Sequence, residues 1–160
     1  MRRALPLLLA VAALAGCGGS KPAGPASVLG KGAAVPYSSG DWAVVVKGDT
    51  AVVAHRVSGA WQADTSGAVK VEILGPSTTQ PQAPTPQVAA QLVSKTPLVE
   101  SALWIDGAEV LEKGGGSPTR GTIYGAPGAP LLPGKHLLVA YARTRSHGTA
   151  VARVFHVAAP

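Results

Sequence analysis

Short apolar runs separated by glycine and proline most constrain what this chain can fold into. The sequence has 20 glycines and 14 prolines among 160 residues, and 46% of its residues are hydrophobic. Frequent glycine and proline interrupt helices and favour turns, whereas the hydrophobic content is sufficient for a buried core. No amphipathic helix pattern is present between the turns. The sequence therefore predicts an all-β fold.

Valine-rich and alanine-rich runs on either side of Gly48-Asp49-Thr50 predict a β-hairpin over residues 42–57. A second block, residues 68–158, contains further short strands. These are expected at 69–74, 87–93 (with a short helix as the alternative), 103–105, 108–111, 121–124, 137–143 and 151–157. The proline-rich segment 76–86 is expected to be an exposed connection, and Gly114–Pro118 a loop. Strands in this pattern are typical of a β-sandwich.

The strand at 137–143 is apolar on both faces. Because side chains alternate along a strand, His136, Leu138, Ala140 and Ala142 share one face, and Leu137, Val139, Tyr141 and Arg143 share the other. An uncovered face would leave an apolar patch in water, so we expect both faces to be covered. The hypothesis is that the apolar hairpin at 42–57 docks on this sheet or extends it, which makes 36–158 one folded unit.

Two segments of the second block resemble bacterial immunoglobulin-like domains. Leu132-Pro133-Gly134-Lys135-His136 enters a long apolar strand, and a polar turn then leads to a last strand ending in Val154-Phe155-His156-Val157, which is similar to the closing hairpin of those domains. The Asp106-Gly107 turn resembles a turn of the same modules. The resemblance covers residues 68–158 and implies an immunoglobulin-like β-sandwich, with residues 36–67 as an additional β-hairpin region packed on it. A fold of this kind does not identify a ligand.

The first 17 residues have the pattern of an export signal. Arg2 and Arg3 precede an apolar stretch from Leu5 to Leu14, which is too short to remain as a membrane-spanning helix. Leu14-Ala15-Gly16-Cys17 resembles the lipobox of bacterial lipoproteins. The resemblance implies cleavage after residue 16 and attachment of lipid to Cys17, with acyl chains such as palmitate.

We therefore expect a signal peptide at 1–16 and a lipidated Cys17 followed by a flexible tether up to residue 35. A short edge strand at 27–29 is the alternative within the tether, and an ordinary signal peptide is the alternative to the lipobox. The expected location is the cell membrane or the outer membrane, with the domain outside the cytoplasm. Two or three acyl chains give a stable anchor, whereas one is marginal.

The candidate metal ligands are His136 and His156, which lie on strands expected to be neighbours. Copper or zinc needs two or three converging imidazoles. A four-residue turn at 145–148 would place residue 137 opposite residue 156, with the two histidines on opposite faces. Met1 is the only methionine, so no methionine cluster for copper(I) exists. No metal cofactor is predicted, and a periplasmic copper- or zinc-binding sandwich remains the alternative function.

Catalytic motifs are also weak. The closest carboxylates are Asp106, Glu109 and Glu112, which follow a hairpin rather than form an oxygen-rich calcium loop. The sequence contains no GxSxG nucleophile elbow, and Gly114–Gly116 lacks the Lys-Ser/Thr of a phosphate-binding loop. Neither an enzyme activity nor a cofactor is predicted.

The net charge and the aromatic content of the sequence indicate which class of partner the chain binds. The formal charge of +6 falls to +4 when Arg2 and Arg3 are removed with residues 1–16, and only 4% of residues are aromatic, which argues against nucleic-acid binding. The tryptophans, Trp42, Trp61 and Trp104, are expected in the core rather than on a sugar-binding face. Arg143, Arg145 and Arg153 are the candidate partner-binding residues. The predicted function is non-catalytic binding or a structural role toward an envelope protein or polysaccharide.

Overall fold

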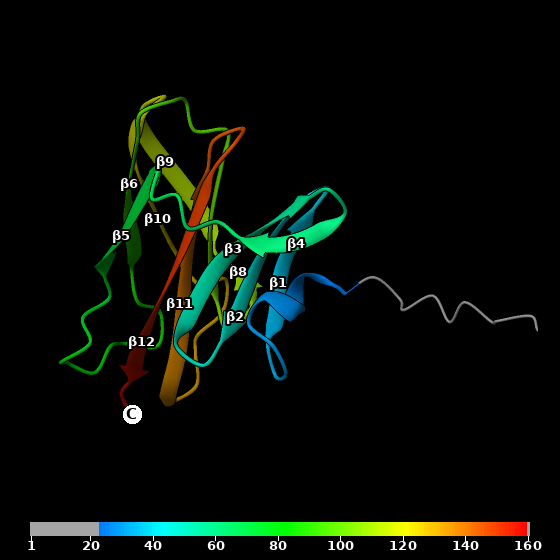
Figure 1. Cartoon of the computed structure of the whole chain (residues 1–160). Helices are drawn as coiled ribbons and strands as arrows, with labels where there is room; N and C mark the ends of the chain where they lie inside the picture. Colours follow the sequence, from blue (N-terminus) through cyan, green and yellow to red (C-terminus); the bar gives the residue numbers. More distant parts are fainter. Residues whose placement is uncertain (1–22, 160) are drawn as a thin grey trace, which may run out of the picture.

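Three four-stranded antiparallel sheets make up the protein (Figure 1). The computed structural model describes residues 23–159. The N-terminal sheet contains β1 (Ala34–Ser39), β2 (Trp42–Lys47), β3 (Thr50–Val57) and β4 (Ala60–Ala63). The outer sheet contains β5 (Val69–Gly75), β6 (Val88–Ser94), β10 (Arg120–Ala126) and β9 (Leu111–Ser117). The central sheet contains β12 (Gly148–Val157), β11 (Gly134–Arg143), β7 (Glu100–Ile105) and β8 (Ala108–Glu109). A short 3₁₀-helix, η1 (Pro25–Val28), precedes them, and the predicted all-β class is confirmed.

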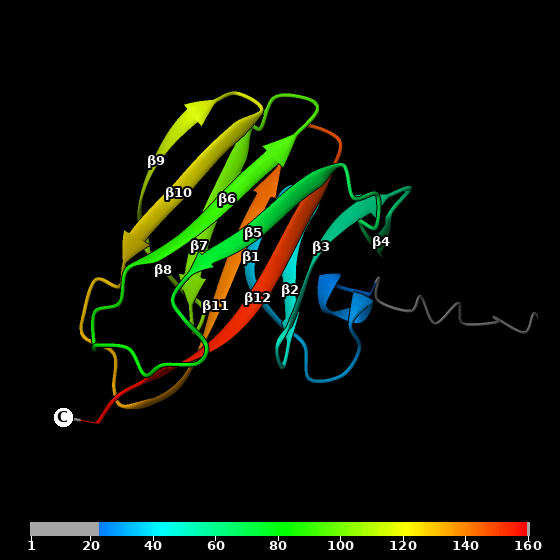
Figure 2. The same ribbon diagram turned by 90° about the vertical axis from the view of Figure 1, so that its left-hand side faces the viewer.

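The outer and central sheets form an immunoglobulin-like β-sandwich. Their strand orders are β5-β6-β10-β9 and β12-β11-β7-β8 (Figure 2). These orders correspond to A-B-E-D and G-F-C-C′ of the immunoglobulin fold, in which the two sheets face each other across one core. The segment at 88–94 is a strand rather than the alternative helix. The sandwich expected from the sequence is therefore confirmed.

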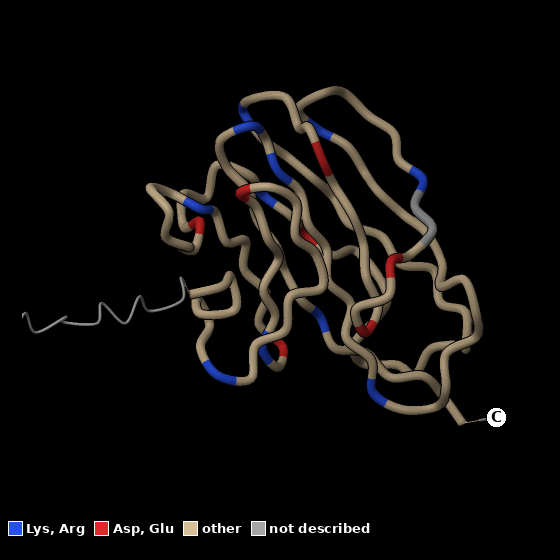
Figure 3. The backbone as a smooth tube through the Cα atoms, turned by 90° about the vertical axis from the view of Figure 1, so that its right-hand side faces the viewer, with Lys and Arg blue, Asp and Glu red and all other residues tan. Residues whose placement is uncertain are grey.

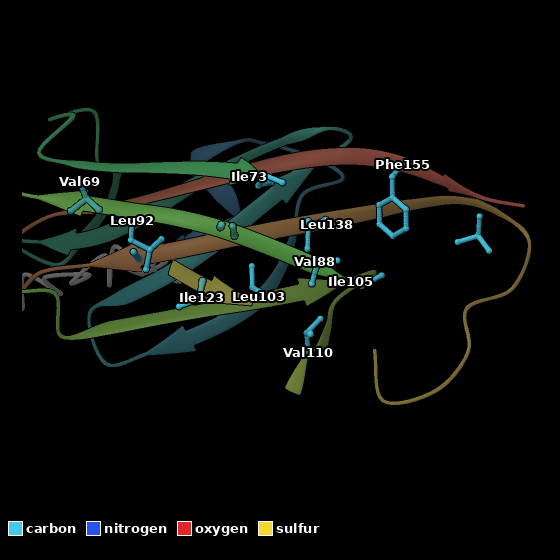
Figure 4. Packing of buried hydrophobic residues seen from close by; sticks show 14 residues of the cluster. Val69, Ile73, Val88, Leu92, Leu103, Ile105, Val110, Ile123, Leu138 and Phe155 are labelled. Carbon is cyan, nitrogen blue, oxygen red and sulfur yellow. The ribbon is translucent and has the colours of Figure 1, made fainter. Parts of the chain in front are cut away.

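Aliphatic side chains and one phenylalanine fill the space between these two sheets (Figure 4). Leu103, Leu138 and Phe155 are fully buried there, facing Val88 and Ile123 of the outer sheet. Burying a side chain of this size contributes roughly 1.5–3 kcal/mol. Apolar packing thus replaces the disulfide that joins the sheets in antibody domains.

The central sheet is covered on both faces, as its sequence predicts. Leu138 and Ala140 face the sandwich core, whereas Val139 and Tyr141 face a second cluster that includes Trp42 of the N-terminal sheet. The N-terminal sheet stacks on the central sheet and does not extend it. The order of layers is therefore outer sheet, central sheet, N-terminal sheet.

The N-terminal segment is larger and more ordered than the predicted hairpin and tether. The hairpin at 42–57 is present, but β1 and β4 flank it and complete a four-stranded sheet. Within the described part of the expected tether, Val28, Leu29 and Ala33 pack against the face of β2 and β3 that points away from the central sheet. Packed structure therefore includes η1 and is not limited to residues from 36 onward, because the apolar outward face of β2 requires a cover.

A loop was predicted at Gly114–Pro118, and this was wrong, because β9 continues through Ser117 and pairs with β10 along its length. Glycine is needed in this strand. Gly116 has φ of 139°, and a Cβ at this position would lie 2.3 Å from the main-chain oxygen of Arg120. The glycines thus permit close strand approach, which composition alone does not distinguish from a loop.

The predicted register of the last hairpin was wrong by two residues. His156 pairs with Lys135, and Leu137 pairs with Val154, because the turn occupies 144–147. A shift of two residues preserves the face on which each side chain lies. The prediction that His136 and His156 occupy opposite faces is therefore confirmed.

Cys17, the expected signal peptide and residues 17–22 of the expected tether lie outside the described residues. Among residues 23–159, no helix has the length and apolar character needed to cross a bilayer.

Candidate functional site

Three connections meet at one end of the sandwich, and we call this region the loop end. It comprises the β6–β7 loop (residues 95–99), the β9–β10 turn (118–119) and the β11–β12 turn (144–147). The Leu98 amide donates to the Pro118 carbonyl at 2.7 Å, and the Val99 amide donates to the Arg143 carbonyl at 2.9 Å. The connections are therefore fixed to one another by main-chain hydrogen bonds. In immunoglobulin variable domains, loops at one end of the sandwich bind antigen.

A shallow depression of about 450 Å³ opens between two of these connections. Its lining combines hydroxyl groups, apolar surface and one guanidinium group. The lining residues are Thr96, Pro97, Val99, Thr144, Arg145 and Ser146. This mixture suits a polar ligand that also presents apolar surface.

The β11–β12 turn is held by hydrogen bonds of its own. Thr144 is 3% exposed, and its Oγ1 donates to the His147 carbonyl at 3.2 Å. The same oxygen accepts from the amides of Ser146 (3.3 Å) and His147 (3.0 Å). Arg145 and Ser146 are therefore presented on a rigid turn, which lowers the entropy that binding would otherwise cost.

Asp64 connects this turn to the segment that follows the N-terminal sheet. Its Oδ2 accepts from the Gly148 amide at 2.7 Å and lies 3.5 Å from Nδ1 of His147. Burial alone would raise the pKa of Asp64, but hydrogen bonds from Ser66 and Gly148 outweigh it and lower the pKa. The carboxylate thus stabilises the turn in its charged form.

Glu100 is at the centre of a cluster between the N-terminal and central sheets. Its Oε2 accepts from Nε of Arg143 at 2.6 Å and from the Tyr141 hydroxyl at 3.3 Å, and its Oε1 accepts from the Tyr37 hydroxyl. The Arg143 guanidinium also lies 5.4 Å from the centre of the Trp42 ring.

The cluster has shifted pKa values that match these contacts. Burial, followed by the charge of Glu100, raises the pKa of Tyr141, and burial and the Glu100 hydrogen bond raise that of Tyr37. Burial lowers the pKa of Arg143, but the hydrogen bond to Glu100 together with the charges of Tyr141 and Glu100 raises it by more. Tyr37, Tyr141 and Arg143 are therefore each stabilised in the protonated form that contacts Glu100 and holds the two sheets together. This is a structural role.

His136 and Asp106 form a second structural pair at the opposite end of β11. Nδ1 of His136 lies 2.6 Å from Oδ2 of Asp106, and Nε2 lies 2.7 Å from the Leu132 carbonyl. Both partners accept hydrogen bonds, so both nitrogens donate only when the ring is protonated. Burial lowers the pKa of His136, but Asp106 and the Leu132 carbonyl raise it by more. Asp106 also accepts from the Leu137 amide at 2.9 Å, within a turn where Asp106 and Gly107 have φ of 51° and 83°.

The three arginines predicted as a partner-binding set do not come together. Arg145 is exposed and lines the depression, whereas Arg143 is paired with Glu100. Arg153 is opposite Leu138 and lies on the other face of the central sheet from Arg143. Only Arg145 therefore remains available for a partner at the loop end.

The two candidate metal ligands are also separated. His156 is exposed beside Lys135, on the face opposite to His136, and His136 already uses both ring nitrogens. Among the side chains that the structure describes, those of residues 23–110 and 113–159, no group of three or more His, Cys, Asp or Glu could hold a metal ion.

Two cationic residues at the loop end were not singled out from the sequence. Lys95 and Arg120 are exposed beside the β6–β7 loop and the β9–β10 turn, and neither forms an ion pair with another described residue. The signal that could have identified them is their position next to connections that meet in an immunoglobulin-like order of strands.

Comparisons with known proteins give no match to this chain among family models, curated proteins or solved structures.

Proposed function

We propose that the chain is a lipid-anchored protein of the cell envelope, outside the cytoplasm, whose sandwich binds a protein or polysaccharide partner at the loop end without catalysing a reaction. The observation that carries the proposal is the rigid loop end. Three connections are joined there by main-chain hydrogen bonds, two of them border one depression, and Lys95, Arg120 and Arg145 are exposed. Rigid loops on a β-sandwich are a common way to present a binding surface.

The nearby carboxylates support binding rather than proton transfer. Asp64 is engaged by the Gly148 amide, and Glu100 by Arg143 and two tyrosines. At the other end of β11, Asp106 is engaged by His136 and the Leu137 amide. Each of these three carboxylates therefore has a structural partner. No specific observation favours the metal-binding alternative.

The anchor rests on the sequence Leu14-Ala15-Gly16-Cys17. Metabolic labelling with a palmitate analogue tests it. The wild-type chain is expected to incorporate the label and to fractionate with membranes, and Cys17→Ala to lose the label. Ser20→Ala, close to the lipobox but outside it, is the control that retains both properties. Labelling that persists in Cys17→Ala, or a soluble wild-type protein, would overturn the anchor.

Binding at the loop end is tested by photo-cross-linking in cells. A photoreactive amino acid at Ser146 lies beside the depression, and one at Lys135 lies at the opposite end of β11. Covalent adducts with an envelope component are expected from position 146 and not from position 135. Adducts at both positions, or at position 135 alone, would contradict a binding role for the loop end.

A further inference from the structure

We propose that the loop end binds an anionic polysaccharide, which Lys95, Arg120 and Arg145 recognise by charge. This inference rests on the binding role proposed above and names the chemical class of the partner. At the loop end, cations are exposed and the neighbouring carboxylates are already paired.

The register of the strands places the cations near one another. Arg120 is opposite Val93, and the Ser94 amide donates to the Thr119 carbonyl at 2.9 Å, which places Lys95 next to the start of β10. Thr96, the residue after Lys95, lines the depression together with Arg145. Figure 3 shows several basic positions at the upper end of the molecule, where these connections lie, and others at its lower end and sides.

Carboxylates do not neutralise these three cations. Glu100 is paired with Arg143, and Asp64 accepts from the Gly148 amide beside His147. The exposed Lys70 is also opposite Val93. However, the carboxylate of Glu72 lies on the same outward face of β5, two residues along the strand from Lys70. We therefore assign the site to the three cations outside β5, which form no ion pair with the described side chains of residues 23–110 and 113–159.

The lining of the depression favours a saccharide. Hydroxyl groups of Thr96 and Ser146 are exposed beside Arg145 and match the hydroxyl groups of a sugar. Pro97 and Val99, the latter 46% exposed, supply apolar surface for the C–H face of a sugar ring.

Composition and charge separate a polysaccharide from a protein partner. Residues 94–99, 117–120 and 144–147 contain no tryptophan, tyrosine or phenylalanine, whereas the energetic centres of protein interfaces are enriched in tryptophan and tyrosine as well as arginine. A polysaccharide with repeated carboxylate or phosphate groups can meet cations on three separate connections at once. Its binding would depend on ionic strength, because the cations are exposed.

The test uses the full chain purified in a non-ionic detergent and immobilised polygalacturonate as the probe. The wild-type protein is expected to bind and to be released by salt. The triple variant Lys95→Gln, Arg120→Gln, Arg145→Gln is expected to bind roughly tenfold more weakly, since three exposed charge contacts are lost. A matched variant, Lys31→Gln, Arg56→Gln, Lys135→Gln, removes the same charge from exposed positions elsewhere and is expected to bind like the wild type.

Circular dichroism first establishes that both variants are folded. Equal weakening in the two triple variants would overturn the proposal, because binding would then follow net charge alone. Equal binding to neutral dextran, equal binding to polyglutamate, or binding only to phosphatidylglycerol vesicles would also overturn it. Cross-linking at position 146 in cells without binding to polygalacturonate would leave the proposed function standing and reject this inference alone.

Discussion

Adjacent residues on β7 test whether the stacked sheets unfold as one unit. Leu103 is fully buried in the sandwich core, and Trp104, 4% exposed, faces the N-terminal sheet. The Trp104 ring lies 5.6 Å from that of Tyr37 and 5.9 Å from that of Tyr141. Leu103→Ala therefore weakens one interface of the central sheet, and Trp104→Ala weakens the other.

Both substitutions are expected to be severe. Truncating a buried leucine costs about 2–5 kcal/mol, and truncating a buried tryptophan about 3–5 kcal/mol. Domains of this size have a free energy of unfolding of about 5–15 kcal/mol. Each variant should thus lose a large part of its stability, with a fall in Tm on the order of 10–15 °C. Leu132→Ala is the control, because this side chain is 78% exposed and should change stability by less than about 0.5 kcal/mol.

Urea unfolding followed by circular dichroism, together with amide hydrogen exchange, measures the outcome. Since the N-terminal and central sheets share one cluster of buried side chains, a single transition is expected for each variant. Exchange protection in β3 and β11 should fall together. Two transitions for Trp104→Ala, or loss of protection in β2 and β3 with β11 unchanged, would refute the argument that 36–158 is one cooperative unit.

Three further predictions concern the turns and their ionised groups. Gly148→Ala is expected to destabilise the protein by about 1–3 kcal/mol in urea unfolding, because the new Cβ would lie 3.0 Å from Cγ1 of Val53. An unchanged unfolding midpoint would contradict tight packing between Gly148 and Val53. The raised pKa of His136 predicts that this group stabilises the folded protein fully below its unfolded pKa, near 6.5, and that the stabilisation is lost as the pH rises through the folded pKa. His136→Gln should remove this pH dependence from urea unfolding curves recorded at a series of pH values. The lowered pKa of Asp64 predicts the opposite pH dependence, with stabilisation present above pH 3.8 and lost as the pH falls through the folded pKa. Asp64→Asn should therefore reduce the loss of stability at acid pH. An unchanged loss would reject the stabilising role of the Asp64 carboxylate.

Much of the fold was predictable because alternation and turn chemistry are local properties. The apolar residues on both faces of 137–143 predicted that both faces would be covered, and the Gly48-Asp49 turn predicted the β2–β3 hairpin. The immunoglobulin-like form of the sandwich was predicted from a resemblance rather than from local pattern. The register of the last hairpin was missed, because it depends on a hydrogen-bonded turn at 144–147 that its sequence does not define.

The candidate site was less predictable than the fold, since it depends on residues distant in the sequence. Arg143 and Arg153 were grouped with Arg145 by proximity along the chain, but the strands place those two on opposite faces of the central sheet. Lys95 is in the β6–β7 loop and Arg120 is at the start of β10, and only the three-dimensional arrangement places both at the end of the sandwich that carries Arg145. Side-chain pairing, such as that between Glu100 and Arg143, also decides which charges remain available.

The packing of η1 against the N-terminal sheet limits how far from the membrane η1 can lie in a lipid-anchored form. Only eight Cα–Cα steps separate Cys17 from Pro25, where the packed structure begins. Eight fully extended residues span at most about 28 Å. With Cys17 held in the lipid, η1 therefore stays within a thin layer above the bilayer. A polymer close to the membrane surface would therefore meet the protein at a high effective concentration.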